Sequence, residues 1–160
     1  MHRAIVAALA VVWLAIPAAA GDIDPYERGT FATIRAAHTQ RPLVVHFWSL
    51  TCIPCLVEMP RLAAMTKSRG DFDLVLVATD PIAQAERIAV RLDKFGLADA
   101  PSYAYVDSFE ERLRFEVDRT WRGELPFTAL VKAGGEMKTV AGELEPATLG
   151  AWLDEDGATR

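Results

Sequence analysis

The sequence has two cysteines, Cys52 and Cys55, which lie three residues apart in the segment HFWSLTCIPCLVEMP at 46–60. Two thiols at this spacing can cycle through a disulfide, bind a metal ion or form a structural cross-link. A cross-link is disfavoured because the loop that it closes is too short to restrict the unfolded chain by much. Structural zinc usually needs four ligands, and no second cluster of cysteines or histidines accompanies the pair. The spacing therefore favours a redox-active pair.

The segments on either side are expected to hold the pair at the start of a helix. Residues 41–48, RPLVVHFW, are mostly apolar, which is typical of a strand buried on both faces. Residues 53–67, IPCLVEMPRLAAMTK, repeat apolar side chains at helical spacing, with a kink expected at Pro60. A helix N-terminus stabilises a thiolate and lowers the pKa of the thiol. Cys52 is then the exposed nucleophile, and Cys55, nearly one turn further, is the buried thiol that resolves a mixed disulfide.

The rest of the chain alternates helices and strands. An apolar run predicts a buried strand at 72–80, and residues 101–107 are also strand-like. A helix capped by Asp80 is expected to run from Pro81 to about Phe95. The segment 108–118 fits a helix or a strand, and a short helix is favoured. The remaining expected elements are a helix at 24–40, a hairpin of strands at 126–132 and 136–142, and a final helix at 145–155. This order predicts a single-domain α/β fold.

The first twenty residues differ from the rest. A short basic start, an apolar run and three alanines before Gly21 fit a secretory signal peptide at 1–20. An uncleaved N-terminal anchor is the alternative, and it alone would place the protein at a membrane. The folded domain is then 21–160, exported to the periplasm if the source is a Gram-negative bacterium. Disulfides persist in such compartments, so export supports a redox role for the pair.

The bulk composition fits a globular domain. Of the 160 residues, 51% are hydrophobic and 24% charged, which is enough for a core and argues against disorder. The net charge is −5 and no basic run is present, so nucleic acid is not an expected partner. A monomer is expected.

Two segments carry a resemblance to a known family. VVHFWSLTCIPCLVEMP resembles the active-site segment of thioredoxin-fold proteins, and its ending, with Glu58 and Pro60, is similar to exported thiol-disulfide oxidoreductases of the TlpA/ResA/DsbE type. WRGELPFTALV at 121–131 resembles the family's Leu-Pro segment. The resemblance covers about residues 28–156. It implies a three-layer α/β fold in which helices flank a central mixed sheet, with a helix-strand insert at 81–106 before a cis-proline.

The resemblance also implies roles for single residues. Cys52 would attack and Cys55 would resolve. Pro126 would be the cis-proline, and the Leu125 backbone would pair with a bound polypeptide near the sulfurs. The other residues expected to contact a partner are Trp48, which precedes the pair, and Ile53 and Pro54, which lie between the two cysteines.

Glu58 and His46 are the candidate proton carriers. Glu58 matches an active-site glutamate of the ResA-like members and could accept the proton of Cys55, or raise a thiol pKa by like-charge repulsion; a solvated helix glutamate is the alternative. His46 stands where thioredoxins keep a buried aspartate. It could take the proton of Cys55, stabilise a thiolate when protonated, or be a hydrogen-bonded core histidine. A second departure is Thr51, which replaces the family's tryptophan.

The expected function is thiol-disulfide exchange with partner proteins through Cys52, with no cofactor. The partners would be thiol- or disulfide-bearing proteins and an upstream redox donor. The resemblance favours the reducing direction, as in cytochrome c maturation or general disulfide reduction. The alternative is a copper metallochaperone that uses the cysteine pair and a histidine.

Overall fold

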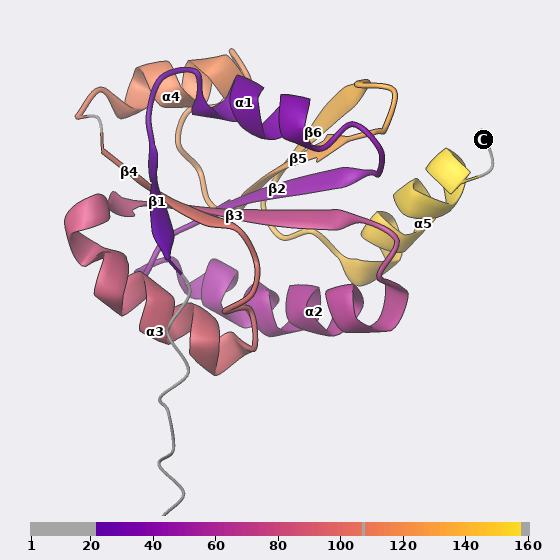
Figure 1. Cartoon of the computed structure of the whole chain (residues 1–160), viewed down its shortest axis with the longest axis horizontal. Helices are drawn as coiled ribbons and strands as arrows, with labels where there is room; N and C mark the ends of the chain where they lie inside the picture. The colour runs from indigo at the N-terminus through magenta and orange to yellow at the C-terminus, as the bar shows by residue number, and fades with distance from the viewer. Residues whose placement is uncertain (1–21, 107, 158–160) are drawn as a thin grey trace, which may run out of the picture.

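A six-stranded mixed sheet forms the middle layer of the computed structural model, which describes residues 22–106 and 108–157 (Figure 1). The predicted signal segment at 1–20 lies outside the described residues. The four parallel strands are, in sheet order, β1 (Ile23–Tyr26), β4 (Ser102–Tyr105), β3 (Asp73–Pro81) and β2 (Leu43–Trp48). The antiparallel strands that follow β2 are β5 (Phe127–Val131) and β6 (Met137–Ala141).

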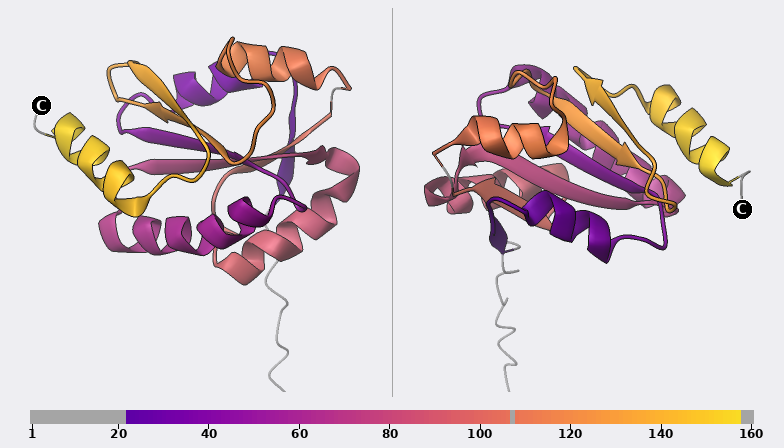
Figure 2. Two further views of the ribbon diagram at one scale, coloured as in Figure 1. Left: turned by 180° about the vertical axis from the view of Figure 1, so that it is seen from behind. Right: turned by 90° about the horizontal axis from the view of Figure 1, so that it is seen from above.

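Helices cover both faces of this sheet. One face is covered by α2 (Ile53–Arg69) and α3 (Ala85–Phe95), with α5 (Pro146–Gly157) packed beside α2 (Figures 1 and 2). The other face is covered by α1 (Thr30–Ala37) and α4 (Glu110–Val117). The predicted three-layer α/β architecture is confirmed, and α3 with β4 forms the predicted helix-strand insert between β3 and the segment that leads to Pro126.

The central strand β2 contributes to two separate cores. Successive side chains of a strand point to opposite faces. Val44 and Trp48 therefore enter the core beneath α2, α3 and α5, whereas Val45 and Phe47 enter the core beneath α1 and α4. All six residues of β2 are buried, as the apolar run at 41–48 predicted.

The segment before α1 differs from the prediction. A helix was expected over 24–40, but residues 23–26 form β1, which pairs in parallel with β4, and α1 spans only Thr30–Ala37. Pro25 is tolerated because β1 is an edge strand with one neighbour. Nothing local in the sequence indicated this strand, since its partner lies in β4.

The prediction at Asp80 was also wrong. β3 continues through Asp80 to Pro81, a 3₁₀ turn spans Ile82–Gln84, and α3 begins only at Ala85. The helix favoured for 108–118 is confirmed as α4, and the predicted hairpin as β5 and β6. Pro60 lies inside α2, which runs from Ile53 to Arg69.

Candidate active site

The two cysteines form a disulfide at the N-terminus of α2. Cys52 is the N-cap residue, Cys55 lies in the first turn, and their sulfurs are 2.03 Å apart. The Cys55 N–H also donates a hydrogen bond to the Cys52 Sγ at 3.2 Å. Cys52 is half-buried and Cys55 is fully buried, which confirms that Cys52 is the more accessible sulfur. The arrangement lets an incoming group reach Cys52 first.

The loop between β2 and α2 is fixed by Asp80. The Asp80 Oδ2 accepts a hydrogen bond from the Leu50 N–H at 2.8 Å, and the Cys52 N–H donates to the Ser49 carbonyl at 3.3 Å. Asp80 is therefore not a helix cap but a brace for the loop that carries the cysteines. The two partners are 30 residues apart, so no local sequence pattern could have revealed the contact.

A cis peptide bond joins Leu125 to Pro126, as the resemblance predicted. β5 begins at Phe127, which pairs with Phe47 near the end of β2. Pro126 therefore lies at the same end of the sheet as the cysteine pair. The Pro126 carbonyl accepts from the Gly142 N–H at 2.8 Å, whereas the N–H and C=O of Leu125 have no hydrogen-bond partner among the described residues.

Trp121 supports the segment that ends in this proline. Its ring stacks on Phe127 with centroids 4.2 Å apart and lies 4.8 Å from the ring of Phe47. Its indole N–H donates to the Glu124 carbonyl at 2.9 Å. Trp121 was not among the predicted site residues, although a bulky aromatic residue this close to the proline could have indicated a supporting role.

His46 is fully buried in β2. Its Nδ1 lies 3.0 Å from the Thr128 Oγ1 on β5, and its Nε2 is a buried atom without a hydrogen-bond partner among the described residues. Burial lowers the pKa of His46 to about 3, so the ring is neutral near pH 7 while the disulfide is formed.

Glu58 is buried on α2, with about 1% of its surface exposed. Its Oε1 accepts a hydrogen bond from the Leu144 N–H at 2.9 Å, and its Oε2 has no partner within the described part of the chain. Burial raises the pKa of Glu58 to about 7, although the Leu144 hydrogen bond opposes the change. A solvated helix glutamate is therefore excluded, and the carboxyl can exchange a proton near neutral pH.

Comparison with known proteins decides the fold. No family model and no curated protein matches the chain. A solved structure of a thioredoxin-related protein from Neisseria meningitidis serogroup B superposes with a TM-score of 0.60 at 25% identity, covering 73% of this chain and 85% of that one. The chain has a thioredoxin-like fold.

Two further structures with this fold are similar. One is a secreted disulfide oxidoreductase of Mycobacterium tuberculosis, described as homologous to Escherichia coli DsbE, with a TM-score of 0.57, 18% identity and coverage of 75% and 85%. The other is a thio-disulfide isomerase from Thermus thermophilus, with a TM-score of 0.56, 19% identity and coverage of 72% and 79%.

Within the thioredoxin-like fold, apolar side chains are exposed next to Cys52. Ile53 is 68% exposed, Val57 is 49% exposed, and Pro54 is also exposed. Trp48, by contrast, is fully buried, so its indole can contribute to the site only from within the core. Thr51, which precedes Cys52 in the chain, is exposed and has a small polar side chain.

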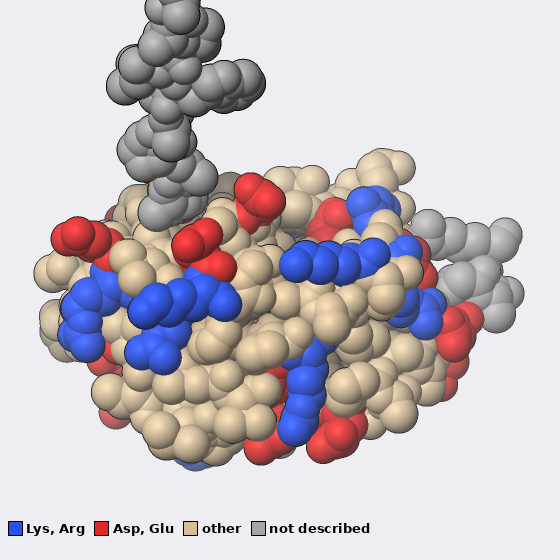
Figure 3. All heavy atoms as spheres, turned by 90° about the horizontal axis from the view of Figure 1, so that it is seen from below, with Lys and Arg blue, Asp and Glu red and all other residues tan. Residues whose placement is uncertain are grey.

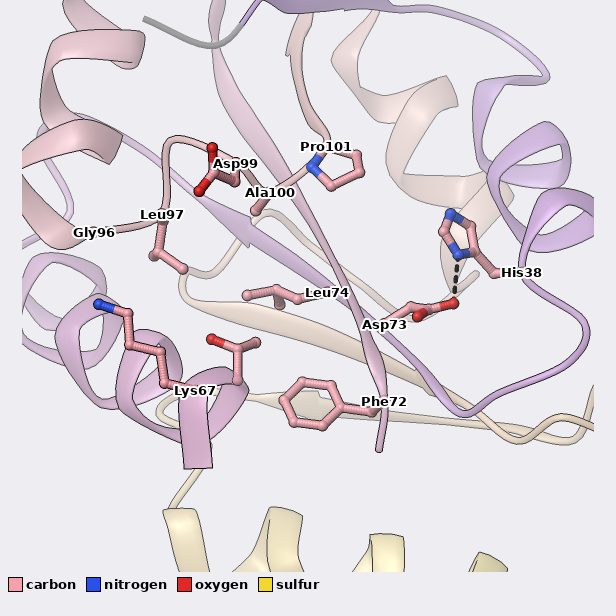
Figure 4. Close-up of a pocket in the computed structure, with 11 residues that line it drawn as sticks. His38, Lys67, Phe72, Asp73, Leu74, Gly96, Leu97, Asp99, Ala100 and Pro101 are labelled. Atoms are coloured by element: carbon pink, nitrogen blue, oxygen red, sulfur yellow. Dashed lines mark hydrogen bonds and ion pairs between the residues drawn. The ribbon is translucent and has the colours of Figure 1, made fainter. Parts of the chain in front are cut away.

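A hollow of about 360 Å³ lies away from the cysteines (Figure 4). It is bordered by the ion pair of His38 and Asp73, whose Nδ1 and Oδ2 are 2.8 Å apart, and by Phe72 and Leu97. Asp73 pairs with Leu43 at the start of β2, whereas the cysteines follow the end of β2. The hollow therefore lies at the opposite end of the sheet and forms no part of the cysteine site.

The outer surface over α2 and α3 carries charges of both signs. Lys and Arg alternate with Asp and Glu over this face (Figure 3), so it creates no strong field of one sign. Among the described residues, no group of three metal-binding side chains gathers in one place. In the described ranges no helix is long and apolar enough to cross a membrane.

Proposed function

We propose that this protein is a thiol-disulfide oxidoreductase that acts on partner proteins through Cys52 and Cys55. The observation that carries the proposal is the disulfide at the N-terminus of α2, with its accessible sulfur on Cys52, at the same sheet end as the cis-proline. A helix N-terminus favours the thiolate, and the thiolate is the nucleophile in disulfide exchange.

The reaction runs in two displacements. The Cys52 thiolate of the reduced pair attacks one sulfur of a partner disulfide, and the other partner sulfur leaves as a thiolate. The Cys55 thiolate then attacks Cys52, which forms the intramolecular disulfide and releases the first partner sulfur. The partner gains two electrons from the cysteine pair, and its two leaving thiolates take up two protons from Glu58 or solvent. An upstream dithiol must supply two electrons and two protons to restore it.

Glu58 is the better acceptor for the proton of Cys55. A cysteine thiol ordinarily has a pKa of about 8.5, so transfer to a carboxyl of pKa about 7 costs only about 2 kcal/mol. Transfer to an imidazole of pKa about 3 would cost about 7 kcal/mol. Glu58 therefore takes the proton in this proposal. His46 belongs to the site as a further buried ionisable group on this side of the sheet.

The partner polypeptide docks beside Cys52. The unpaired N–H and C=O of Leu125 can form hydrogen bonds with an extended segment of the partner. Ile53 and Pro54 offer exposed apolar surface next to the nucleophile, and Pro126 fixes the segment that carries Leu125.

We further propose that the protein acts as a monomeric reductant outside the cytoplasm, as a protein of the TlpA/ResA/DsbE type. The support is the signal-like segment at 1–20 and the ending with Glu58 and Pro60. A secreted oxidoreductase is among the similar structures. An uncleaved segment 1–20 would add membrane attachment. Equilibration of the pair with glutathione at known ratios tests the direction, because a potential above that of glutathione would contradict a reducing role.

The copper alternative gains no support from the geometry. The described residues place no third metal-binding side chain with the two sulfurs. Titration of the reduced protein with Cu(I) separates the two functions, because tight one-to-one binding would favour the metallochaperone.

Substitution of the nucleophile tests the proposed activity. Reduction of a model protein disulfide should fall to the uncatalysed rate in Cys52→Ser, because no thiolate remains at the accessible position. Thr51→Ser is the matched control, since it changes the neighbouring exposed residue and should keep the rate. Full activity in Cys52→Ser would contradict the proposal.

A further inference from the structure

His46 and Thr128 form a buried pair between neighbouring strands. They are directly opposite each other in the register of β2 and β5, and both are fully buried. The Nδ1 of His46 lies 3.0 Å from the Thr128 Oγ1. Among the described side chains, His46 is the hydrogen-bond partner of the Thr128 hydroxyl. A neutral imidazole has one N–H and one acceptor nitrogen, so the pair can exist in two arrangements.

One of the two arrangements leaves fewer buried polar groups without a hydrogen-bond partner. If the Nδ1–H donated to Oγ1, the Thr128 O–H would have no described side chain as acceptor and Nε2 would also lack a donor. If instead the Thr128 O–H donates to Nδ1, the hydroxyl and Nδ1 are both satisfied, and only the Nε2–H lacks a partner. Buried polar groups without partners are costly. The arrangement with fewer of them places the hydrogen on Nε2.

Strand alternation places His46 on the side of the sheet that faces the core with the resolving cysteine. His46 alternates with Val44 and Trp48 on the face of β2 beneath α2, and this core includes Cys55. Besides the cysteines and tyrosines, the buried ionisable residues within 22–106 and 108–155 are His46, Glu58 and Asp80. The Asp80 carboxylate is bound to the Leu50 N–H. From α3 and α5 this core receives apolar side chains: Ile88, Leu92, Leu149, Trp152 and Leu153.

We propose that Thr128 is a positioning residue that holds His46 as the Nε2–H form, so that His46 donates a hydrogen bond to the Cys55 thiolate. In the disulfide this donor has no partner. Reduction creates one, because the sulfur becomes an acceptor that carries a negative charge. The inference rests on the proposed function, since the thiolate of Cys55 matters only if this cysteine resolves a mixed disulfide.

The two buried groups then have different tasks. Glu58 takes the proton from the Cys55 thiol, and His46 stabilises the thiolate that remains. The low pKa of His46 supports this division, because a neutral ring can donate from Nε2 but is a poor proton acceptor. Environments that push two pKa values apart commonly separate such roles.

NMR of the imidazole tests the tautomer independently of any activity. In the wild-type disulfide form near pH 7, long-range ¹H–¹⁵N spectra should show His46 protonated at Nε2 and unprotonated at Nδ1. A ring protonated at Nδ1 would overturn the inference. This result would leave the proposed function intact, because that function depends on Cys52.

Substitution of Thr128 tests the consequence for Cys55. In reduced Thr128→Val, the midpoint of the Cys55 ¹³Cβ titration should rise by about one pH unit, as expected for loss of a hydrogen bond to a charged group. Thr128→Ser keeps the hydroxyl and should restore the wild-type midpoint, even if Thr128→Val folds poorly. Thr139→Val is the matched control, because Thr139 also donates a side-chain hydrogen bond, to Asp118 at 2.6 Å, but from β6.

The titration should be repeated in a Glu58→Gln background, where the carboxyl no longer titrates. Equal midpoints in Thr128→Val and wild type would overturn the inference. A shift in Thr128→Val that Thr128→Ser does not restore would also overturn it. Loss of activity only in Cys52→Ser, with no effect of Thr128→Val on the midpoint, would sustain the proposed function and reject the role of Thr128.

Discussion

The two faces of the sheet bury different kinds of polar group. Beneath α1 and α4, Tyr26 and Tyr105 stack with centroids 5.3 Å apart, and each hydroxyl is buried without a partner among the described residues. Burial raises the pKa of both phenols, so they stay neutral. Beneath α2, the unpartnered atoms include the Glu58 Oε2 and the His46 Nε2.

The difference is whether burial creates a group that can change charge near neutral pH. A phenol whose pKa rises on burial moves further from neutrality and becomes inert. The Glu58 carboxyl, whose pKa rises to about 7, moves into the range in which it can gain or lose a proton near neutral pH. The face beneath α1 and α4 therefore acts as a scaffold, whereas the face beneath α2 buries a carboxyl that can change charge, on the same helix as Cys55. The following predictions test this contrast.

The largest effect is expected from Phe47→Ala on the scaffold face. Phe47 is fully buried and contacts the rings of Tyr26, Trp121 and Phe127. Removal of a buried aromatic ring should lower the free energy of unfolding by about 3–5 kcal/mol. Denaturant unfolding with the disulfide intact measures this, and Phe47→Leu should lose less. A loss below about 1 kcal/mol would show that this face does not hold the fold together.

Glu58→Gln should change the pH dependence of stability. A carboxyl whose pKa is higher in the folded protein stabilises the fold at low pH, and this contribution is lost as the pH rises from about 4.5 to about 7. Wild type should therefore lose about 3 kcal/mol relative to Glu58→Gln across this range. Unfolding of both oxidised proteins at several pH values measures the difference. The exposed Glu86 on α3 provides the control Glu86→Gln, and parallel pH profiles for wild type and Glu58→Gln would contradict the assignment.

Asp80→Ala should have an intermediate effect. It leaves the Leu50 N–H without its carboxylate partner, which costs about 1–3 kcal/mol. The loosened loop should also slow disulfide exchange, because the loop carries Cys52. Asp80→Asn keeps an acceptor oxygen and should recover most of the stability. An equal loss of stability in Asp80→Ala and Asp80→Asn would show that the hydrogen bond to Leu50 does not hold the loop.

Tyr105→Phe should have the smallest effect. Its hydroxyl makes no hydrogen bond with the described residues. Its removal relieves an unpaired buried polar group but leaves a small void, so the free energy of unfolding should change by less than about 0.5 kcal/mol. The pH midpoints of both cysteines should not change. A measurable shift in either midpoint would show that the two faces are coupled, which the contrast excludes.

The features that could be predicted from the sequence are local. The buried strand, the adjacent cysteine pair and the helix that follows are expressed in residue spacing over 41–67. The hairpin at 126–142 shows in its two apolar runs and the glycines between them. The cis bond at Pro126 came from the resemblance of the Leu-Pro segment, because spacing alone cannot indicate a peptide isomer.

The features that were missed depend on pairs far apart in the chain. β1 exists because it pairs with β4, Asp80 braces Leu50 from the neighbouring strand, and Thr128 meets His46 across 82 positions. The spacing of apolar residues describes one segment at a time, so it cannot reveal contacts between distant segments. For His46 in particular, the sequence could not indicate its hydrogen-bond partner Thr128.

Trapping of a mixed disulfide tests the central claim most directly. Reduced Cys55→Ala should form a stable covalent adduct with a disulfide-bearing protein, and peptide mass spectrometry should place the link on Cys52. The double variant Cys52→Ala/Cys55→Ala should form none. The account predicts an adduct that a reductant reverses. Absence of any adduct, or a link that avoids Cys52, would contradict it.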